Sequence, residues 1–456
     1  MAGLCRNLHP HFSTIVHVPL ILLCTLPSPT IAATNINNPS VTEKSSVDRQ
    51  ALLSFKLQLS NDPLGALASW RNGSANFCNW QGITCSKKHT NRVIALDLRS
   101  KGLVGQIALS VSNLSFLTTI DLSDNHLHSA IPDAIGGLKR LRKLNLSMNS
   151  LDGMIPAALS SLSSLEEISL WNNLLTGEIP SNLSRCSNLK FIHFSSNKLQ
   201  GRIPPWIGTL PALQVLNLSG NNFVGNIPDS LGTTPSLTFV NLGQNYLTGG
   251  IPHNITNSQY LQYLVLPYNS LSGRIPPELF NSSSLLVLDL KRNNFTGVIP
   301  SVNTVSSPLF SLTLSDNSLS GSIPISLANF SSLSHFTLIL QANRFEGPIP
   351  ASLVNASSLE VLDLGLNSFH RFIPRLGTLT MLKELDIGVN HLEKQDWSSL
   401  FYLTNCSNLV KLLLDDNKFS KIGLPLGVFS LLSLLCILRF YPSFLTSIAC
   451  HLDLDL

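Results

Sequence analysis

Hydrophobic residues recur along the chain in one pattern, L-x-x-L-x-x-L-x-L-x-x-N-x-L-x-G-x-I-P, with a spacing of about 24 residues. The stretch SLTFVNLGQNYLTGGIPHNI (236–255) carries this pattern, and LQVLNLSGNNFVGNIP before it and LQYLVLPYNSLSGRIP after it repeat it. Alternate side chains of a strand point to opposite faces, so the two leucines of x-L-x-L-x enter the interior and the x residues face outward. No single unit buries its leucines alone, so the pattern predicts an α/β solenoid of stacked coils joined by a parallel sheet.

One asparagine marks almost every coil. The intervals between these asparagines are 24 residues eight times and then 26, 24, 23 and 27, and an earlier coil has Lys101 in the same place, which makes about fourteen coils. A backbone that turns inside a dry core needs hydrogen-bond partners, and a short amide side chain supplies a donor and an acceptor. We therefore predict a structural ladder formed by Asn125, Asn149, Asn173, Asn197, Asn221, Asn245, Asn269, Asn293, Asn317, Asn343, Asn367, Asn390 and Asn417.

The region before the repeats predicts a lid for the first coil. Residues from Ser45 to Leu59 are typical of an amphipathic helix with Leu52, Phe55 and Leu59 on one face, ended by Asn-Asp-Pro at 61–63. Trp70, Trp80 and the pair Cys78 and Cys85 follow, and the two cysteines are close enough in sequence to form a disulfide in an oxidising compartment. Cys186 and Cys406 are interpreted as small buried hydrophobic residues.

The N-terminus has the layout of a secretory signal, with Arg6, an apolar stretch at 15–26 and small residues at 30–34. We therefore divide the chain into a signal peptide (1–33), a cap (34–90), repeats (91–425) and an atypical hydrophobic tail (426–456). Charged residues make up only 12% of the 456 residues, the net charge is +4, and the 30 Lys and Arg are scattered, so nothing indicates a nucleic-acid partner.

Eleven Asn-x-Ser/Thr sequons support the secretory pathway. Nine of them are expected to carry glycans: Asn72, Asn113, Asn182, Asn254, Asn281, Asn294, Asn329, Asn355 and Asn405. The other two, Asn145 and Asn217, fall at outward positions of the predicted strands, so a glycan there would stand on the same face as a bound ligand. Our hypothesis is that ligands avoid these two positions.

The lid (DRQALLSFKLQLSNDPLGALASW…FCNWQGITC) and the L-x-G-x-I-P coils resemble the extracellular part of plant leucine-rich-repeat receptor kinases and receptor-like proteins, over about residues 46–421. This resemblance implies a leucine-rich-repeat superhelix with a plant-type cap, placed at the cell surface or in the apoplast. It also implies a monomer that binds a peptide or protein ligand and recruits a co-receptor kinase, in defence or development, without a cofactor.

Outward strand positions of successive coils lie side by side, which suits an extended ligand. Aromatic residues and arginine are the usual anchors of interfaces. The candidate ligand-binding residues on this basis are Trp171, Phe191, His193, Phe239, Asn241, Tyr263, Tyr268, Asp289, Lys291 and Arg292, with Ser195 and Val265 among the exposed positions beside them. The same face then becomes acidic at Asp363, Glu384, Asp386, Asp415 and Asp416, and we interpret these carboxylates as solvated.

Enzyme motifs are missing from the sequence: neither G-x-G-x-x-G nor G-x-S-x-G nor H-E-x-x-H occurs, and the twelve histidines do not cluster, so no catalytic or metal site is expected. The tail contains 17 uncharged residues, 422–438, where a membrane-spanning helix needs about 20. We interpret the tail as the end of an array cut short, with a membrane segment as the alternative. Two other functions stay open: a secreted inhibitor of a wall-degrading enzyme, similar to polygalacturonase inhibitors, and a truncated product without function.

Overall fold

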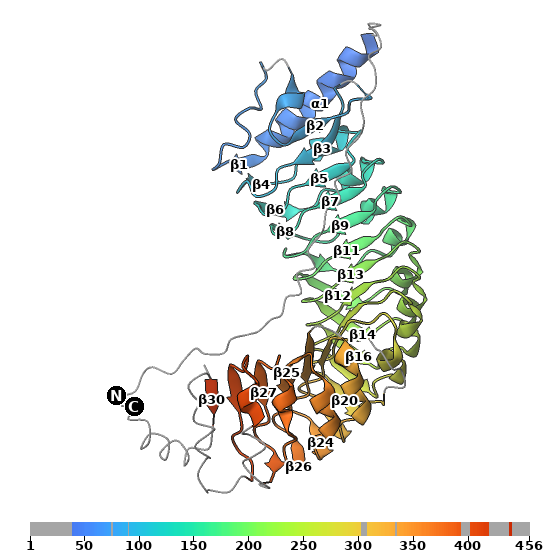
Figure 1. Ribbon diagram of the computed structural model, residues 1–456. Coiled ribbons are helices and arrows are strands. Elements are labelled where there is room, and N and C mark those ends of the chain that lie inside the picture. The colour runs from blue at the N-terminus through green and yellow to red at the C-terminus, as the bar shows by residue number, and fades with distance from the viewer. Residues whose placement is uncertain are drawn as a thin grey trace, which may run out of the picture. The chain divides into compact units, whose positions relative to one another are not determined.

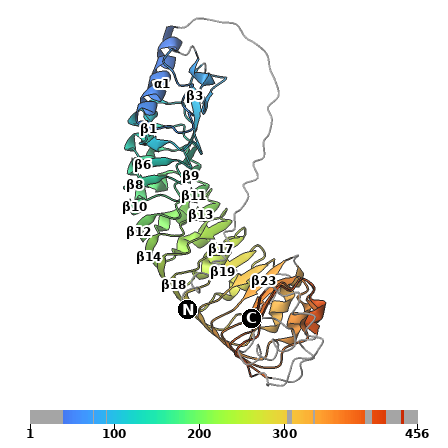
Figure 2. The ribbon, with the colours of Figure 1, turned by 90° about the vertical axis from the view of Figure 1, so that its left-hand side faces the viewer.

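The computed structural model describes residues 39–73, 76–89, 91–301, 308–332, 335–393, 402–418 and 437–439, and the side chains of these residues except 39–45, 329–332 and 437–439. The chain divides into two units, Met1–Ser40 and Val41–Leu456. The predicted signal peptide lies outside the described residues. The second unit contains the coils, which follow one another in chain order from the cap to β29 (Figure 1, Figure 2).

A 16-stranded sheet takes one strand from each coil. Its strands are parallel from β3 onward, in register with their neighbours, as the alternating leucines predict. Without β2 of the cap and β30 of the predicted tail, fourteen strands remain among the described residues, one for each expected coil. The strands are β2 (Ile83–Cys85), β3 (Val93–Asp97), β5 (Thr119–Asp121), β7 (Lys143–Asn145), β9 (Glu167–Ser169), β11 (Phe191–His193), β13 (Val215–Asn217), β15 (Phe239–Asn241), β17 (Tyr263–Val265), β19 (Val287–Asp289), β21 (Ser311–Thr313), β23 (Phe336–Ile339), β25 (Leu359–Asp363), β27 (Glu384–Asp386), β29 (Lys411–Leu413) and β30 (Ile437–Arg439).

A second set of strands follows the asparagines and forms two side sheets, which the sequence reasoning missed. The first contains β1 (Leu59–Asn61), β4 (Val104–Gly105), β6 (His126–Ala130) and β8 (Ser150–Asp152). The second contains β10 (Thr176–Gly177), β12 (Lys198–Arg202), β14 (Asn222–Asn226), β16 (Tyr246–Gly249), β18 (Ser270–Gly273), β20 (Asn294–Gly297), β22 (Ser318–Gly321), β24 (Arg344–Gly347), β26 (Ser368–Arg371) and β28 (His391–Leu392).

The coils return through short 3-10 helices, so the one α-helix among the described residues, α1 (Pro39–Leu57), belongs to the cap. Most of these helices begin directly after the proline of Ile-Pro, which fixes φ and lacks an N–H at a position where none is needed. They are η1 (Phe77–Asn79), η2 (Leu109–Asn113), η3 (Asp133–Gly137), η4 (Ala157–Ser161), η5 (Ser181–Arg185), η6 (Pro205–Thr209), η7 (Asp229–Thr233), η8 (His253–Asn257), η9 (Pro277–Asn281), η10 (Ile325–Ser332), η11 (Ala351–Asn355), η12 (Leu376–Thr378) and η13 (Tyr402–Asn405).

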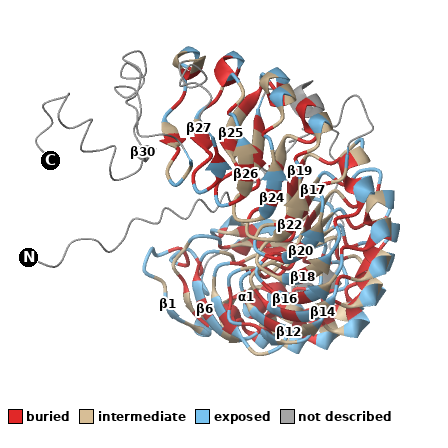
Figure 3. Cartoon of the chain, turned by 90° about the horizontal axis from the view of Figure 1, so that it is seen from below, coloured by how far each residue is buried: buried red, intermediate tan, exposed pale blue. Residues whose placement is uncertain are grey.

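The asparagine ladder lies inside the stack. Asn245 is 6% exposed, and its Nδ2 donates to the carbonyl oxygens of Leu242 and Gly243 in its own coil and of Leu218 in the preceding coil, each at 3.1 Å. Its Oδ1 accepts from the N–H of Phe223 at 3.0 Å. The same four contacts recur at every asparagine of the ladder, from Asn125 to Asn417. Each amide therefore ties two successive coils together, within the leucine core that Figure 3 shows as buried.

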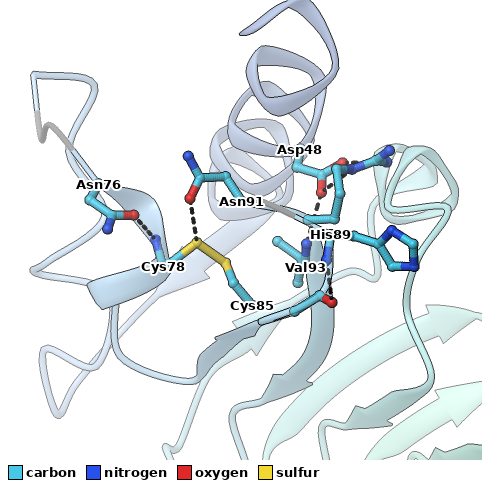
Figure 4. The surroundings of a disulfide bond; sticks show 9 residues. Asp48, Asn76, Cys78, Cys85, His89, Asn91 and Val93 are labelled. Atoms are coloured by element: carbon cyan, nitrogen blue, oxygen red, sulfur yellow. Dashed lines mark hydrogen bonds and ion pairs between the residues drawn. A yellow bond between two sulfur atoms is a disulfide. The ribbon is translucent and has the colours of Figure 1, made fainter. Parts of the chain in front are cut away.

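The cap closes the first coil through both apolar packing and a buried ion pair. Leu52 and Phe55 of α1 are buried, and the Phe55 ring lies 6.3 Å from that of Trp70. The fully buried Asp48 accepts hydrogen bonds from the guanidinium of Arg92 and from the N–H of Val93. Figure 4 shows this contact beside the disulfide between Cys78 and Cys85, whose Cα atoms lie 5.5 Å apart.

The expected bounds of the helix were wrong at both ends. The helix begins at Pro39 rather than Ser45, and Leu59 lies in β1, not on the helix. The reason is tertiary: β1 pairs antiparallel with β4, so Leu59 faces Gly105. Asp62 then accepts from the N–H groups of Ala66 and Leu67 and holds the following turn.

The predicted tail has three described residues, Ile437–Arg439, which form β30 and pair parallel with β29. The rest of the uncharged segment at 422–438 lies outside the described residues. Across the part of the chain that is described, no helix is both long enough and apolar enough to cross a bilayer.

Candidate functional site

The outward side chains of the 16-stranded sheet, together with the two turn residues before each asparagine, form one continuous surface, which we call the strand face. The register places equivalent positions of neighbouring coils side by side: Phe239 pairs with Tyr263, and Asn241 with Val265 and then Asp289. Adjacent strands of a sheet are about 4.8 Å apart, so a ligand lying across them meets one coil after another.

The candidate residues Trp171, Phe191 and His193 form an aromatic cluster over β9 and β11. The Trp171 and His193 rings stack with centroids 5.6 Å apart, and the Phe191 ring meets His193 edge-on at 5.9 Å. Burial lowers the pKa of His193 to about 4, so the imidazole is neutral above that pH. Ser195, expected to be exposed beside them, is buried, and its Oγ lies 2.7 Å from His193 Nε2.

Seven further candidates form what we call the central patch: Phe239, Asn241, Tyr263, Tyr268, Asp289, Lys291 and Arg292. The Phe239 and Tyr263 rings lie 5.7 Å apart on neighbouring strands. The Arg292 guanidinium lies over the Tyr268 ring at 5.0 Å, and its Nε is 3.6 Å from an Asp316 carboxylate oxygen. Apart from the exposed Arg292, these side chains are half-buried, so they offer aromatic area that is already held in place.

Asp289 gives the central patch a titratable group. Burial raises the pKa of its carboxyl to about 6, against the hydrogen bond from the N–H of Lys291 and the charge of the Lys291 side chain. Its neighbours in register are Val265 and Thr313, neither of which is charged. The Asp289 carboxyl therefore changes its charge between pH 5 and 7. Burial causes this shift in pKa, and no neighbouring carboxylate contributes to it.

The central patch and the aromatic cluster lie on opposite sides of β13. Between them lies β13, whose outward residue Asn217 faces His193 on one side and Asn241 on the other. Of the ten candidates, three therefore lie on the cluster side of Asn217 and seven on the patch side.

The interpretation of the later carboxylates as solvated was wrong for two of them. Asp386 is only 7% exposed, and burial, together with the charge of Asp386, raises the pKa of Asp363 to about 7. Both lie in register on β25 and β27. Gly365 makes room for them, because a Cβ there would lie 2.8 Å from a carboxylate oxygen of Asp386. A glycine beside an aspartate in consecutive coils was the sequence signal for this burial.

Sequence reasoning also missed two ladders of alternating charge that border the strand face. In the first, Glu166 lies between Lys190, at 3.0 Å, and Arg142, at 2.6 Å, and these two hydrogen bonds lower the pKa of the Glu166 carboxyl. In the second, Glu360 lies between Lys383 and His335. Aligning the coils on their asparagines would have found the first ladder, since Arg142, Glu166 and Lys190 each lie seven residues before an asparagine. It would have found only Glu360 and Lys383 of the second, because His335 precedes a register shift in β23.

Most sequons lie away from the strand face. Seven of the predicted sites lie in the 3-10 helices: Asn113, Asn182, Asn254, Asn281, Asn329, Asn355 and Asn405. Asn72 is in the cap, and Asn294 begins β20 of the side sheet. The strand face therefore carries Asn145 and Asn217 alone among the eleven.

Comparison with known proteins agrees with this architecture. A family model described as a leucine rich repeat N-terminal domain matches residues 45–86, and leucine rich repeat models match 115–175, 163–223, 260–282 and 308–330. The chain is built of leucine-rich repeats. Its free cysteines Cys186 and Cys406 are buried, as predicted for this core.

Its relatives are plant receptor kinases. A stretch of 75 residues is 49% identical to the LRR receptor-like serine/threonine-protein kinase EFR of Arabidopsis thaliana, and one of 78 residues is 44% identical to the receptor kinase-like protein Xa21 of Oryza sativa subsp. japonica. Each match covers 16% of this chain, but only 7% of EFR and 8% of Xa21.

Solved receptor ectodomains match over most of the chain. The ectodomain of the membrane receptor kinase GASSHO1/SCHENGEN3 of Arabidopsis thaliana, in complex with CASPARIAN STRIP INTEGRITY FACTOR 2, is 34% identical with a TM-score of 0.76. The match covers 82% of this chain and 44% of that one. PEPR1 in complex with AtPEP1 is 33% identical with a TM-score of 0.77, and the match covers 87% of this chain and 56% of PEPR1.

Proposed function

We propose that the protein recognises an extended peptide or protein ligand on its strand face, as the non-catalytic ectodomain of a plant cell-surface receptor. The observation that carries this proposal is the central patch, which places aromatic rings, a carboxyl and two basic side chains on three adjacent strands. Interfaces depend on such anchors, because they bury much area at little cost in side-chain entropy.

The comparisons support a ligand of this kind. Two of the similar ectodomains were solved with a bound ligand, CASPARIAN STRIP INTEGRITY FACTOR 2 and AtPEP1, and a third is described as a plant peptide hormone receptor in complex with RGF2. The proposal includes the further parts of the expectation: an extracellular location in the secretory pathway, a co-receptor kinase as second partner, and signalling in defence or development.

A peptide-display selection on the secreted chain tests the proposal. Peptides selected on the wild-type protein would be measured against Tyr263→Ala and Lys291→Ala. Loss of an anchor side chain typically costs about 1–2 kcal/mol or more, so binding is expected to weaken about 5- to 30-fold or more.

Tyr246→Ala is the matched control, because Tyr246 is equally aromatic and 61% exposed but lies on β16 of the side sheet. Its affinity should equal that of the wild type. Peptides that lose binding with Tyr246→Ala and keep it with Tyr263→Ala would contradict the assignment of the site to the strand face.

A further inference from the structure

We infer that Asn217 carries an N-linked glycan whose first sugar rests against the aromatic cluster of Trp171, Phe191 and His193, so that the cluster holds the chain's own glycan rather than the ligand. This inference rests on the proposed function, because it requires passage through the secretory pathway. It defines the boundary of the ligand site at β13.

The hydrogen bonds of Asn217 leave one amide hydrogen free for modification. Oδ1 accepts from the N–H of Ser219 at 3.2 Å and from its hydroxyl at 2.8 Å, which fixes the orientation of the amide. Nδ2 lies 3.1 Å from His193 Nε2. An amide nitrogen only donates, so Nε2 is the acceptor and the neutral imidazole carries its proton on Nδ1. Nδ2 keeps one hydrogen after glycosylation, which is the number that the contact with Nε2 requires, and the two bonds to Oδ1 do not involve Nδ2.

The modification itself needs no group from the protein beyond the sequon. A lipid-linked oligosaccharide diphosphate is the donor: the bond from Nδ2 to C1 of N-acetylglucosamine forms, the bond from C1 to the diphosphate oxygen breaks, and Nδ2 loses one proton. Asn217 points outward at the end of β13, Ser219 follows in the turn, and both side chains are half-buried.

The aromatic cluster is placed to receive the sugar. His193 is in register with Asn217, and Trp171 stacks on His193 from the far side. The apolar C–H face of a pyranose packs well on a flat ring, and this platform is uncharged. Asn145, on β7, lies in the same row on the other side of the cluster, about 14 Å from Asn217 at three strand spacings.

Another sequon shows the opposite arrangement. The Asn254 amide is packed against the preceding coil, with Nδ2 donating to the Asp229 carbonyl at 2.8 Å and Oδ1 buried without a partner. A sugar on Asn254 would have to leave through this contact. The two sequons therefore differ in what holds the amide nitrogen: a side chain of the strand face at Asn217, and a backbone carbonyl of the preceding coil at Asn254.

The test uses the full chain secreted from plant cells, with glycopeptide mapping and hydroxyl-radical footprinting. Ser219→Ala removes the sequon but keeps Asn217 and its contact with His193, and Ser219→Thr keeps the sequon. We expect a glycan on Asn217 in the wild type and in Ser219→Thr, and a severalfold increase in oxidation of Trp171 and His193 in Ser219→Ala. Ser184→Ala, which removes the distant sequon at Asn182 on η5, should leave that oxidation unchanged.

Three results would speak against the inference, and they differ in meaning. Asn217 without glycan while Asn182 carries one would overturn it and leave the proposed function intact. A glycan on Asn217 with equal oxidation of Trp171 in the wild type and Ser219→Ala would overturn the contact with the cluster. No secretion of the full chain, with no glycan on any sequon of the chain kept in the cells, would instead remove the secretory location from the proposed function.

Discussion

The central patch and the acidic end of the strand face lie on different coils of the same design, but they carry different chemistry. The acidic end consists of Asp363, Glu384, Asp386, Asp415 and Asp416. Asn245 and Asn390 make equivalent hydrogen bonds beneath them. Above the first lie aromatic rings with Lys291 and Arg292, and above the second lie carboxylates opposed by Lys411. The interior of each coil thus fixes the position of each outward side chain, but it does not constrain which residue type occupies that position.

The largest expected effect comes from breaking the scaffold beneath either region. Asn245→Leu leaves the N–H of Phe223 without a partner, and Asn390→Leu does the same to the N–H of Phe369. Each variant also removes one of the two hydrogen bonds at three carbonyl oxygens, so it should cost about 5 kcal/mol of local stability, at about 1–3 kcal/mol for the unpaired N–H and about 1 kcal/mol for each lost bond. Hydrogen exchange of the neighbouring strands measures this loss. Tyr246→Ala and His391→Ala change the exposed next residue and should cost little. A much milder effect of Asn390→Leu would show that the two regions do not share one scaffold.

The acidic end should lose stability as the pH rises. The folded-state pKa of Asp363, about 7, lies above its usual 3.8, so the folded chain keeps a proton that the unfolded chain releases. The stabilisation is complete below pH 4 and is lost as the pH rises to 7, up to about 4 kcal/mol. Asp386 and Glu384 on β27 oppose ionisation of Asp363, and Lys411 on β29 favours it.

Asp363→Asn should remove most of this pH dependence, as read from hydrogen exchange of β25 and β27 corrected for intrinsic rates. Asp416→Asn is the control, because Asp416 is exposed at the same end. If the wild-type strands are equally stable at pH 5 and pH 8, the burial of this pair has no thermodynamic effect.

The central patch should show the same trend with a smaller amplitude. The pKa of Asp289, about 6, is also above its usual 3.8, so its stabilisation is lost between pH 4 and 6, up to about 3 kcal/mol. The midpoint in β19 should therefore lie below that in β25, because no second carboxylate faces Asp289 in register. Asp289→Asn should make β19 insensitive to pH. An unchanged pH profile in this variant would assign the titration to another group.

The smallest effect concerns Arg292. Its contact with the Tyr268 ring is largely exposed, so Arg292→Ala should reduce stability by no more than about 1 kcal/mol. Thermal unfolding beside the wild type measures this. A much larger loss would mean that Arg292 holds the patch together, and reduced ligand binding by the variant could no longer be assigned to a lost contact.

The interior could be predicted from the sequence because its causes are local. The role of Asn245 follows from the chemistry of an amide in a dry turn, and Phe55 faces the core because of its spacing. Leu59 could not be placed in this way, because its strand exists only through pairing with Gly105, 46 residues away. The side sheets were missed for the same reason. Their strands are only two to five residues long, which is too short for a recognisable alternation of hydrophobic and polar residues.

The strand face was predicted in outline and not in detail. Tyr263 does stand on it, since strand alternation alone decides which way it points. Trp171 and Arg292 stand on it as residues of the turns that follow β9 and β19. The burial of Asp386 depends instead on Gly365 in the neighbouring coil. That dependence is invisible when each coil is examined separately, and the separation of the aromatic cluster from the central patch by Asn217 is equally a property of several coils together.

The asparagine ladder also gives the stack a direction. The Asn221 amide bonds the carbonyl of Phe194 and the N–H of Leu199, which belong to the preceding coil. In its own coil, the N–H of Phe223 finds its partner only in Asn245 of the next coil. A new coil already bonds to its predecessor, as the N–H of Gln214 does to the Lys190 carbonyl, but the asparagine that completes its turn comes from its successor. Assembly of the array should accordingly advance from the cap in step with synthesis, with only the newest turn unfinished at any moment.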